Sequence, residues 1–111
     1  MTETFKFSCP YLEQEVELSQ DREQHIAASH PDLLPEHRQS IIETLADPDE
    51  IRRSKRFVNA LLFSHWFADL KGGKYVVVVV VSEGGIIGRH WIVTAYIARK
   101  LAEGDVVWKR N

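Results

Sequence analysis

Two histidines near the start of the chain are the first side chains with obvious chemical capacity. His25 and His30 are five residues apart, which on a regular helix places them about 140° apart rather than on one face. A zinc-binding helix spaces its histidines by four residues, and no cysteine cluster accompanies this pair, so metal binding is not predicted. Imidazole exchanges protons near neutral pH, which makes both residues candidates for general acid–base catalysis. For His30 a structural role is the alternative, because a cationic side chain is favoured at the C-terminal end of a helix.

A second group of candidates comes from the alternating segment between residues 89 and 97. One set of alternate positions is uniformly apolar and is predicted to pack under the helices: Trp91, Val93, Ala95 and Ile97. The opposite face then carries His90, Thr94 and Tyr96, whose imidazole and hydroxyl groups can hold a phosphate and move protons. The alternative is an ordinary solvent-exposed face, and the pattern alone favours that alternative.

Basic side chains are the third group. The first fifty residues contain three basic and twelve acidic residues, whereas the remaining 61 contain eleven basic and four acidic residues. This asymmetry predicts an anionic partner for the second half, two halves that attract each other, or simply two differently charged solvated faces. The run at residues 52–56, together with Lys71 and Lys74, can neutralise RNA phosphates, or it can protect a sheet edge from pairing with another chain.

A sheet must position these groups, and its centre is predicted at residues 74–81. Six consecutive valines follow Lys74 and Tyr75, with paired glycines at 72–73 and 84–85 on either side. β-Branched side chains favour a strand, and the lack of strict alternation predicts a central strand covered on both faces. The paired glycines are predicted turns and not a nucleotide fingerprint, because no strand–GxGxxG–helix context surrounds them, so no cofactor is predicted.

The remaining segments are predicted as cover or as neighbours of this strand. A hairpin with Pro10 in its turn precedes a helix that Ser19 caps and that ends near Ser29, before a second helix that begins at Pro35. Further strands are predicted over 51–57, 58–67, 89–98 and 106–108. The order predicts an α+β fold, in which an N-terminal hairpin and two helices pack on one face of a four- to five-stranded, mainly antiparallel sheet.

Composition limits the class of protein. The chain has 111 residues, of which 44% are hydrophobic and 27% charged, and this predicts one globular domain over residues 1–111. The lone Cys9 excludes an internal disulfide and fits a reducing compartment. The N-terminus lacks the features of a signal peptide, and the valine run is too short to cross a bilayer. We therefore expect a cytoplasmic protein without a membrane partner.

Several segments together resemble the phage-type barnase–EndoU–colicin–RelE-like (BECR-fold) nuclease domains. They are residues 9–11, 22–33, 42–49, the valine strand, 91–96 and Trp108, so the resemblance covers nearly the whole chain. It implies a compact α+β fold with helices on one face of a four-stranded antiparallel sheet and an RNA-cleaving cleft on the other. It also implies toxin, phage or mobile-element systems, with an antitoxin or immunity protein as a possible partner. By this resemblance, the candidate catalytic positions are His25, His30 and Thr94. The glutamate–arginine–histidine trio of barnase-like members has no obvious counterpart here.

The predicted function is that of a metal-independent endoribonuclease of the toxin type. One histidine would act as base and the other as acid while the ribose 2′-hydroxyl attacks the adjacent phosphate. The alternative is a non-catalytic RNA- or protein-binding module on the same fold. A shared cleft for the catalytic candidates would favour the nuclease, whereas wide separation would count against it. The predicted substrate-binding residues are Arg53, Arg56, Lys74, Arg89, His90 and Tyr96.

Overall fold

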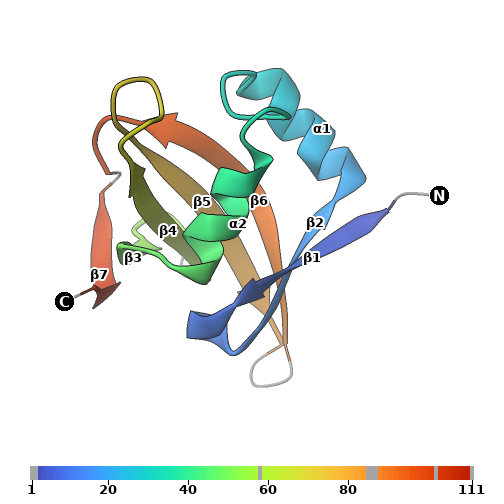
Figure 1. Cartoon of the computed structure of the whole chain (residues 1–111). Coiled ribbons are helices and arrows are strands. Elements are labelled where there is room, and N and C mark those ends of the chain that lie inside the picture. The colour runs from blue at the N-terminus through green and yellow to red at the C-terminus, as the bar shows by residue number, and fades with distance from the viewer. Residues whose placement is uncertain (1–2, 58, 85–87, 102, 111) are drawn as a thin grey trace.

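The structure is a computed structural model that describes residues 3–57, 59–84, 88–101 and 103–110 (Figure 1). Two helices, α1 (Gln20–Ser29) and α2 (Arg38–Ala46), lie between an N-terminal hairpin and the remaining strands, and a short 3-10 turn, η1 (Pro10–Leu12), joins the two strands of the hairpin. The strands are β1 (Thr4–Cys9), β2 (Gln14–Ser19), β3 (Glu50–Ser54), β4 (Ala60–Phe67), β5 (Lys74–Glu83), β6 (Arg89–Ala98) and β7 (Gly104–Lys109).

All of these strands belong to one mixed, seven-stranded sheet in the order β1-β2-β6-β5-β4-β3-β7. The predicted fold, with four to five mainly antiparallel strands and a separate hairpin, is therefore wrong. The hairpin extends the sheet through one parallel pairing, between Glu17 of β2 and Trp91 of β6. At the other end, β7 pairs along β3. Both additions pair backbone groups that a smaller sheet would leave open at its edges.

The valine strand β5 is the fourth of the seven strands, which confirms the prediction that it is central. Val76, Val78 and Val80 are fully buried on the side of the sheet that packs against α2, which we call the helix face. Val77, Val79 and Val81 point to the opposite side, the open face, where Val79 and Val81 are half-buried. Two predicted positions, Val58 in the strand over 58–67 and Gly85 in the turn after β5, lie outside the described residues.

A β-bulge in β6 changes which residues face the helices. Val79 pairs with Thr94 but Val80 pairs with Ile92, so Val93 is an extra residue opposite the β5 strand. Ahead of the bulge, His90 and Ile92 lie on the helix face and are buried. After it, Ala95 and Ile97 lie on this face, where Ala95 is buried and Ile97 is half-buried. The predicted face is therefore right for Ala95 and Ile97 and wrong for Trp91 and Val93, because strict alternation does not continue through a bulge.

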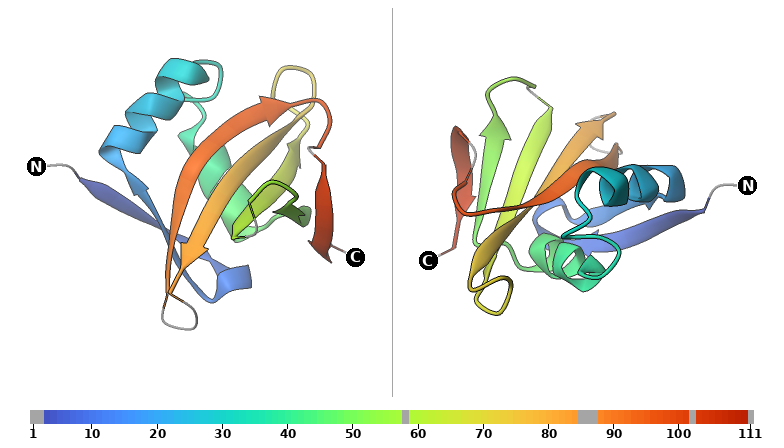
Figure 2. Two further views of the ribbon diagram at one scale, coloured as in Figure 1. Left: turned by 180° about the vertical axis from the view of Figure 1, so that it is seen from behind. Right: turned by 90° about the horizontal axis from the view of Figure 1, so that it is seen from above.

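The two helices occupy different places, as Figure 2 shows from behind and from above. α2 buries Ile41, Thr44 and Leu45 and packs against β1, β4 and β5. α1 buries only Ile26 and packs against β2 and β6, at the edge of the sheet. The prediction that both helices cover one face is therefore wrong for α1. Because β2 and β6 pair at a single position, the rest of that edge of β6 is left for α1 to cover.

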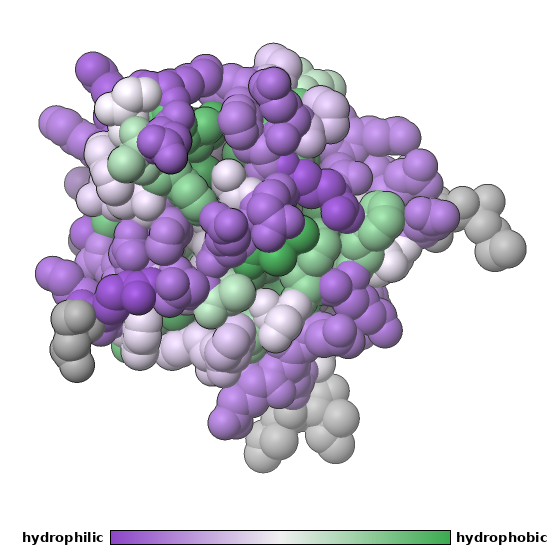
Figure 3. Space-filling view, viewed as in Figure 1, coloured by the Kyte–Doolittle hydropathy of each residue, from purple (hydrophilic) through white to green (hydrophobic). Residues whose placement is uncertain are grey.

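The segment between the helices also differs from the prediction. α2 begins at Arg38 rather than at Pro35, because residues 31–37 form turns. Leu33 and Leu34 in these turns are buried in the core, so the segment packs instead of extending the helix. Seen from the helix side, the surface is mostly hydrophilic, with apolar side chains visible only between the polar ones (Figure 3).

Candidate functional site

Helix α1 and strand β6 carry most of the predicted site residues. The Ser19 hydroxyl accepts a hydrogen bond from the backbone N–H of Arg22 at 3.1 Å and so caps the start of α1, as predicted. At the other end, the His30 N–H donates to the Ile26 carbonyl at 2.6 Å, and the His30 carbonyl accepts from Leu33 at 3.0 Å. These bonds define both ends of α1, which packs against β2 and β6.

His30 and Tyr96 are brought together at the C-terminal end of α1. The centroids of the two rings lie 6.0 Å apart, with 39° between their planes. Both side chains are half-buried. Burial raises the pKa of the Tyr96 phenol above its ordinary value, so its hydroxyl keeps the proton that a hydrogen-bond donor needs. The structure thus joins two predicted site residues from distant parts of the chain.

Thr94 lies on the open face, on the same side of β6 as Tyr96. Its partner in the sheet is Val79, and the partner of Tyr96 is Val77. Thr94 lines a hollow of about 450 Å³ on this face together with apolar side chains, among them Val79 and Val93. We call this hollow the apolar groove.

His25 projects from the exposed side of α1 and does not join His30 and Thr94. It lines a hollow with Ser19, Asp21 and Arg22, and Ser19 and Arg22 also line a second hollow that contains Arg89. Neither hollow includes His30 or Thr94. The separation has a simple cause, since a spacing of five residues turns His25 and His30 about 140° apart on a helix.

Arg89 is held by an ion pair at the single β2–β6 bridge. Its Nε and one terminal nitrogen donate to the two carboxylate oxygens of Glu17 at 3.1 and 2.9 Å, and its guanidinium lies 5.9 Å from the centre of the Trp91 ring. The bond from Arg89 holds the pKa of the Glu17 carboxyl below its usual range. Arg89 therefore supports the junction between the hairpin and the sheet, although its side chain is 72% exposed.

His90 is on the wrong face for the predicted polar surface. It is only 7% exposed, it lies on the helix face, and its Nδ1 is 2.6 Å from the Ser82 hydroxyl oxygen. The prediction that His90 shares a face with Thr94 and Tyr96 is therefore wrong, for the reason given by the bulge at Val93. Because this buried imidazole has a hydrogen-bond partner, it can occupy a structural position in the core.

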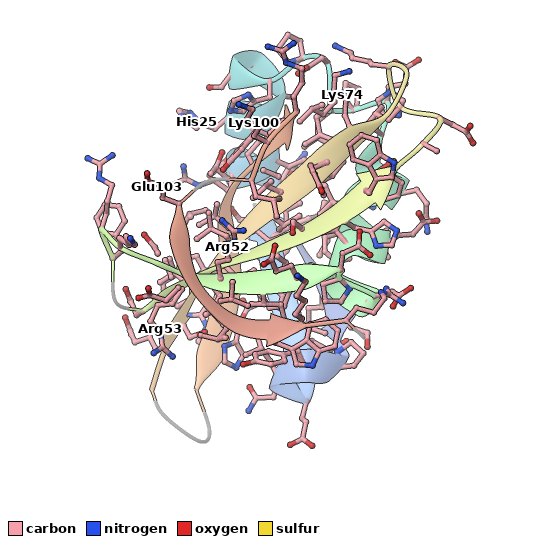
Figure 4. All side chains as sticks on the ribbon, turned by 90° about the vertical axis from the view of Figure 1, so that its left-hand side faces the viewer. His25, Arg52, Arg53, Lys74, Lys100 and Glu103 are labelled. Carbon is pink, nitrogen blue, oxygen red and sulfur yellow. The ribbon has the colours of Figure 1, made fainter. Side chains whose placement is uncertain are left out.

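The predicted cationic residues lie on several different segments, and Figure 4 labels two of them, Arg53 and Lys74. Arg53 and Arg56 are exposed on and after β3, the strand next to the edge strand β7 and far from α1. Lys74 begins β5, where its ammonium donates to the carbonyls of Lys71 and Gly73 at 2.9 and 3.2 Å. Figure 4 also labels Arg52 of β3 and Lys100, which follows β6, so several segments contribute positive charge.

Two features of the site escaped the sequence analysis. Arg22 lines both hollows beside α1, and its spacing of three residues from His25 was a signal that they share a helix face. The apolar groove was missed because the side chains that form it come from four strands, β3 to β6, and from Phe57 after β3. The register between these strands cannot be read from any one of them.

Comparisons with known proteins add no assignment, since no family model, curated protein or solved structure matches this chain. Among the described residues, no group of three or more His, Cys, Asp or Glu side chains is placed to hold a metal ion. Within the same residues, none of the helices has the length and apolar character needed to cross a membrane.

Proposed function

We propose that the protein is an endoribonuclease that binds single-stranded RNA across the open face and cuts it at the edge formed by α1 and β6. The observation that carries this proposal is the contact between His30 and Tyr96, because it brings a proton-exchanging group to the edge of a face that carries hydroxyl and cationic side chains. The resemblance of the sequence to BECR-fold nucleases supports the same activity. A cytoplasmic location and a protein inhibitor of the antitoxin or immunity type belong to this proposal.

The reaction needs a base, an acid and groups that hold the phosphate. One histidine takes the proton of the ribose 2′-hydroxyl, whose oxygen then attacks the adjacent phosphorus. The bond from phosphorus to the 5′-oxygen breaks, the second histidine gives that oxygen a proton, and a cyclic phosphate remains. Tyr96 and Thr94 donate hydrogen bonds to the phosphate. His25 lies about 7.5 Å along the helix axis from His30, so an RNA chain lying along α1 can reach both.

The surface around this edge suits a single strand of nucleic acid. Proteins that bind single strands combine cationic grooves with exposed aromatic rings on which bases stack. Here, Lys100 follows β6 and is exposed (Figure 4), and Arg52 of β3 pairs with Leu62 of the open face. Trp66 is 44% exposed and packs edge-on against Tyr75, with ring centroids 5.0 Å apart. This aromatic pair at the end of β4 and the start of β5 offers a stacking platform.

A second candidate function is RNA binding without cleavage. It is favoured by the separation of the catalytic candidates, because His25 and Thr94 line different hollows. One experiment separates the two candidates: purified protein is incubated with total RNA in EDTA, new 5′ and 3′ ends are mapped, and binding to labelled RNA is measured in parallel. New ends with cyclic phosphates support the nuclease. Binding without new ends supports the second candidate, and the absence of both overturns the proposal.

A further inference from the structure

The apolar groove on the open face has the composition of a protein-docking surface. Leu62, Val79, Val81 and Val93 line its floor, and Phe57 stands at its mouth. These aliphatic side chains are half-buried, whereas the valines on the helix face of β5 are fully buried. Phe57 is 60% exposed, the largest exposure among the bulky apolar side chains that the structure describes. Such a patch resembles the apolar centre of an interface more than a solvated surface.

The bulge in β6 contributes directly to this groove. The extra residue, Val93, and its neighbour Thr94 both line it, which regular alternation would not allow. A regular strand would place only one of these two adjacent side chains on the open face. The chain thus departs from regular pairing at the point where the departure adds apolar area to the groove.

The mouth of the groove is positively charged. Arg53, Lys55 and Arg56 are exposed on and after β3, and the Arg56 guanidinium lies 5.9 Å from the centre of the Phe57 ring. Asp105 of β7 is the cross-strand partner of Arg53, and Glu103 precedes β7 at this end. These two acids offset part of the charge, so the excess positive charge lies at Lys55 and Arg56, next to Phe57.

We propose that the apolar groove docks a protein segment that carries bulky apolar side chains flanked by carboxylates. The apolar side chains would enter the groove beside Phe57, and the carboxylates would pair with Lys55 and Arg56 at its mouth. An RNA base fits less well, because a floor of valine and leucine side chains offers no partner for the donors and acceptors on the base edges. This inference does not depend on RNA cleavage, although Thr94 lines the groove and also belongs to the proposed RNA site.

The test uses a displayed library of random short peptides, selected against the full chain and then against its Phe57→Ala variant. We expect the selected peptides to be enriched in Asp or Glu together with Leu, Phe or Trp. A synthetic copy of the best peptide should bind Phe57→Ala at least about tenfold more weakly than the parent chain, as for the loss of an interface hot spot. The Val79→Thr variant keeps the shape of the strand while making the groove floor polar, and it should also weaken binding.

Matched controls separate this site from the RNA surface. Replacing Trp66 by Ala removes an exposed aromatic ring outside the groove and should leave peptide affinity within about twofold while weakening RNA binding. A peptide with Lys in place of every Asp and Glu should bind at least about tenfold more weakly. No enrichment, equal binding to Phe57→Ala, or equal binding of the charge-reversed peptide would overturn the proposal. The proposal would also be overturned if Phe57→Ala bound RNA more weakly but bound the peptide as well as the parent chain does, because this result would assign the groove to RNA.

Discussion

The two faces of strand β5 carry the same amino acid, valine, but differ in how completely it is buried. Val76, Val78 and Val80 are fully buried on the helix face, where they pack against α2 and the rest of the core. Val79 and Val81, between and beside them in sequence, remain half-buried on the open face. A run of identical residues is therefore fully buried on the helix face but only partly covered on the open face, where Val77 is buried and Val79 and Val81 are not. Residue type alone does not tell these roles apart, because burial depends on what covers each face.

The difference in burial between the two faces is tested most directly by placing one charged residue on each face. We expect Val78→Asp to lower the free energy of unfolding by more than about 4 kcal/mol, because an unpaired carboxylate would enter the core. Val79→Asp should cost less than about 2 kcal/mol, because its carboxylate can reach water from the open face. Urea unfolding followed by tryptophan fluorescence measures both values. Equal losses in the two variants would show that the open face is as well covered as the helix face.

The next largest effect concerns the edge beside α1. Replacing His25 or His30 by Ala should lower the rate of RNA cleavage by about two to four orders of magnitude, the usual value of a positioned acid or base. Unfolding should change little for His25→Ala, since this side chain is exposed. The rates are measured in EDTA on an RNA with one scissile site, and a single deoxyribose at that site serves as the control that must resist cleavage.

This experiment can also fail in an informative way. Folded His25→Ala and His30→Ala proteins that cut RNA at the parent rate would remove both residues from catalysis. Loss of the parent activity in EDTA would indicate a metal requirement. Thr94→Val should cost less than either histidine variant, because it removes one hydrogen bond and keeps the β-branched shape.

A smaller effect, on RNA affinity, is expected from the basic residues on and after β3. If Arg53 and Arg56 contact phosphates, the double variant Arg53→Ala, Arg56→Ala should bind RNA more weakly. The slope of log affinity against log salt should also fall by about 0.7 for each lost contact with a single strand. Titrations at several salt concentrations measure the slope. An unchanged slope would assign these side chains to solubility or to the docking of a protein segment.

The smallest effect is the pH dependence of the ion pair at the β2–β6 bridge. Arg89 lowers the pKa of Glu17 in the folded protein, so the pair stabilises the fold above the ordinary pKa of a glutamate and loses this contribution as pH falls through the lowered value. The melting temperatures of the parent and of Glu17→Gln should therefore differ slightly at pH 7 and converge once the pH falls below the lowered pKa of Glu17. A difference that persists in acid would mean that Glu17 acts through packing and not through its charge.

The sequence predicted local elements better than their arrangement. The hairpin, the cap at Ser19, the central valine strand and the strand over 89–98 are all present, because turn residues and β-branched runs act over short distances. The pairing of β2 with β6 and of β3 with β7 joins segments far apart in the chain, and no local pattern encodes it. The bulge at Val93 was equally hidden, and it reversed the expected face of His90 and Trp91.

The candidate site was predictable only in part. Histidine, threonine and tyrosine were recognised by their chemistry, and the structure places His30 beside Tyr96. How far His30 and Tyr96 lie from His25 and Arg89 depends on the position of α1 beside β6. The sheet leaves room for α1 there because β2 and β6 pair only at Glu17 and Trp91. Such a placement is a property of the whole sheet and cannot be derived from spacing along one helix.

The pairing of β3 with β7 has a consequence for the growing chain. About fifty residues separate these strands, so during synthesis β3 and β4 can form while β7 is still missing. The backbone groups on the outer edge of β3 are then open to pairing with any other strand, including that of a neighbouring nascent chain. Arg52 and Arg53 lie in that strand, and positive charge on an edge opposes such pairing between copies. We therefore expect these arginines to limit aggregation of the unfinished chain, a role separate from any contact that they make in the finished protein.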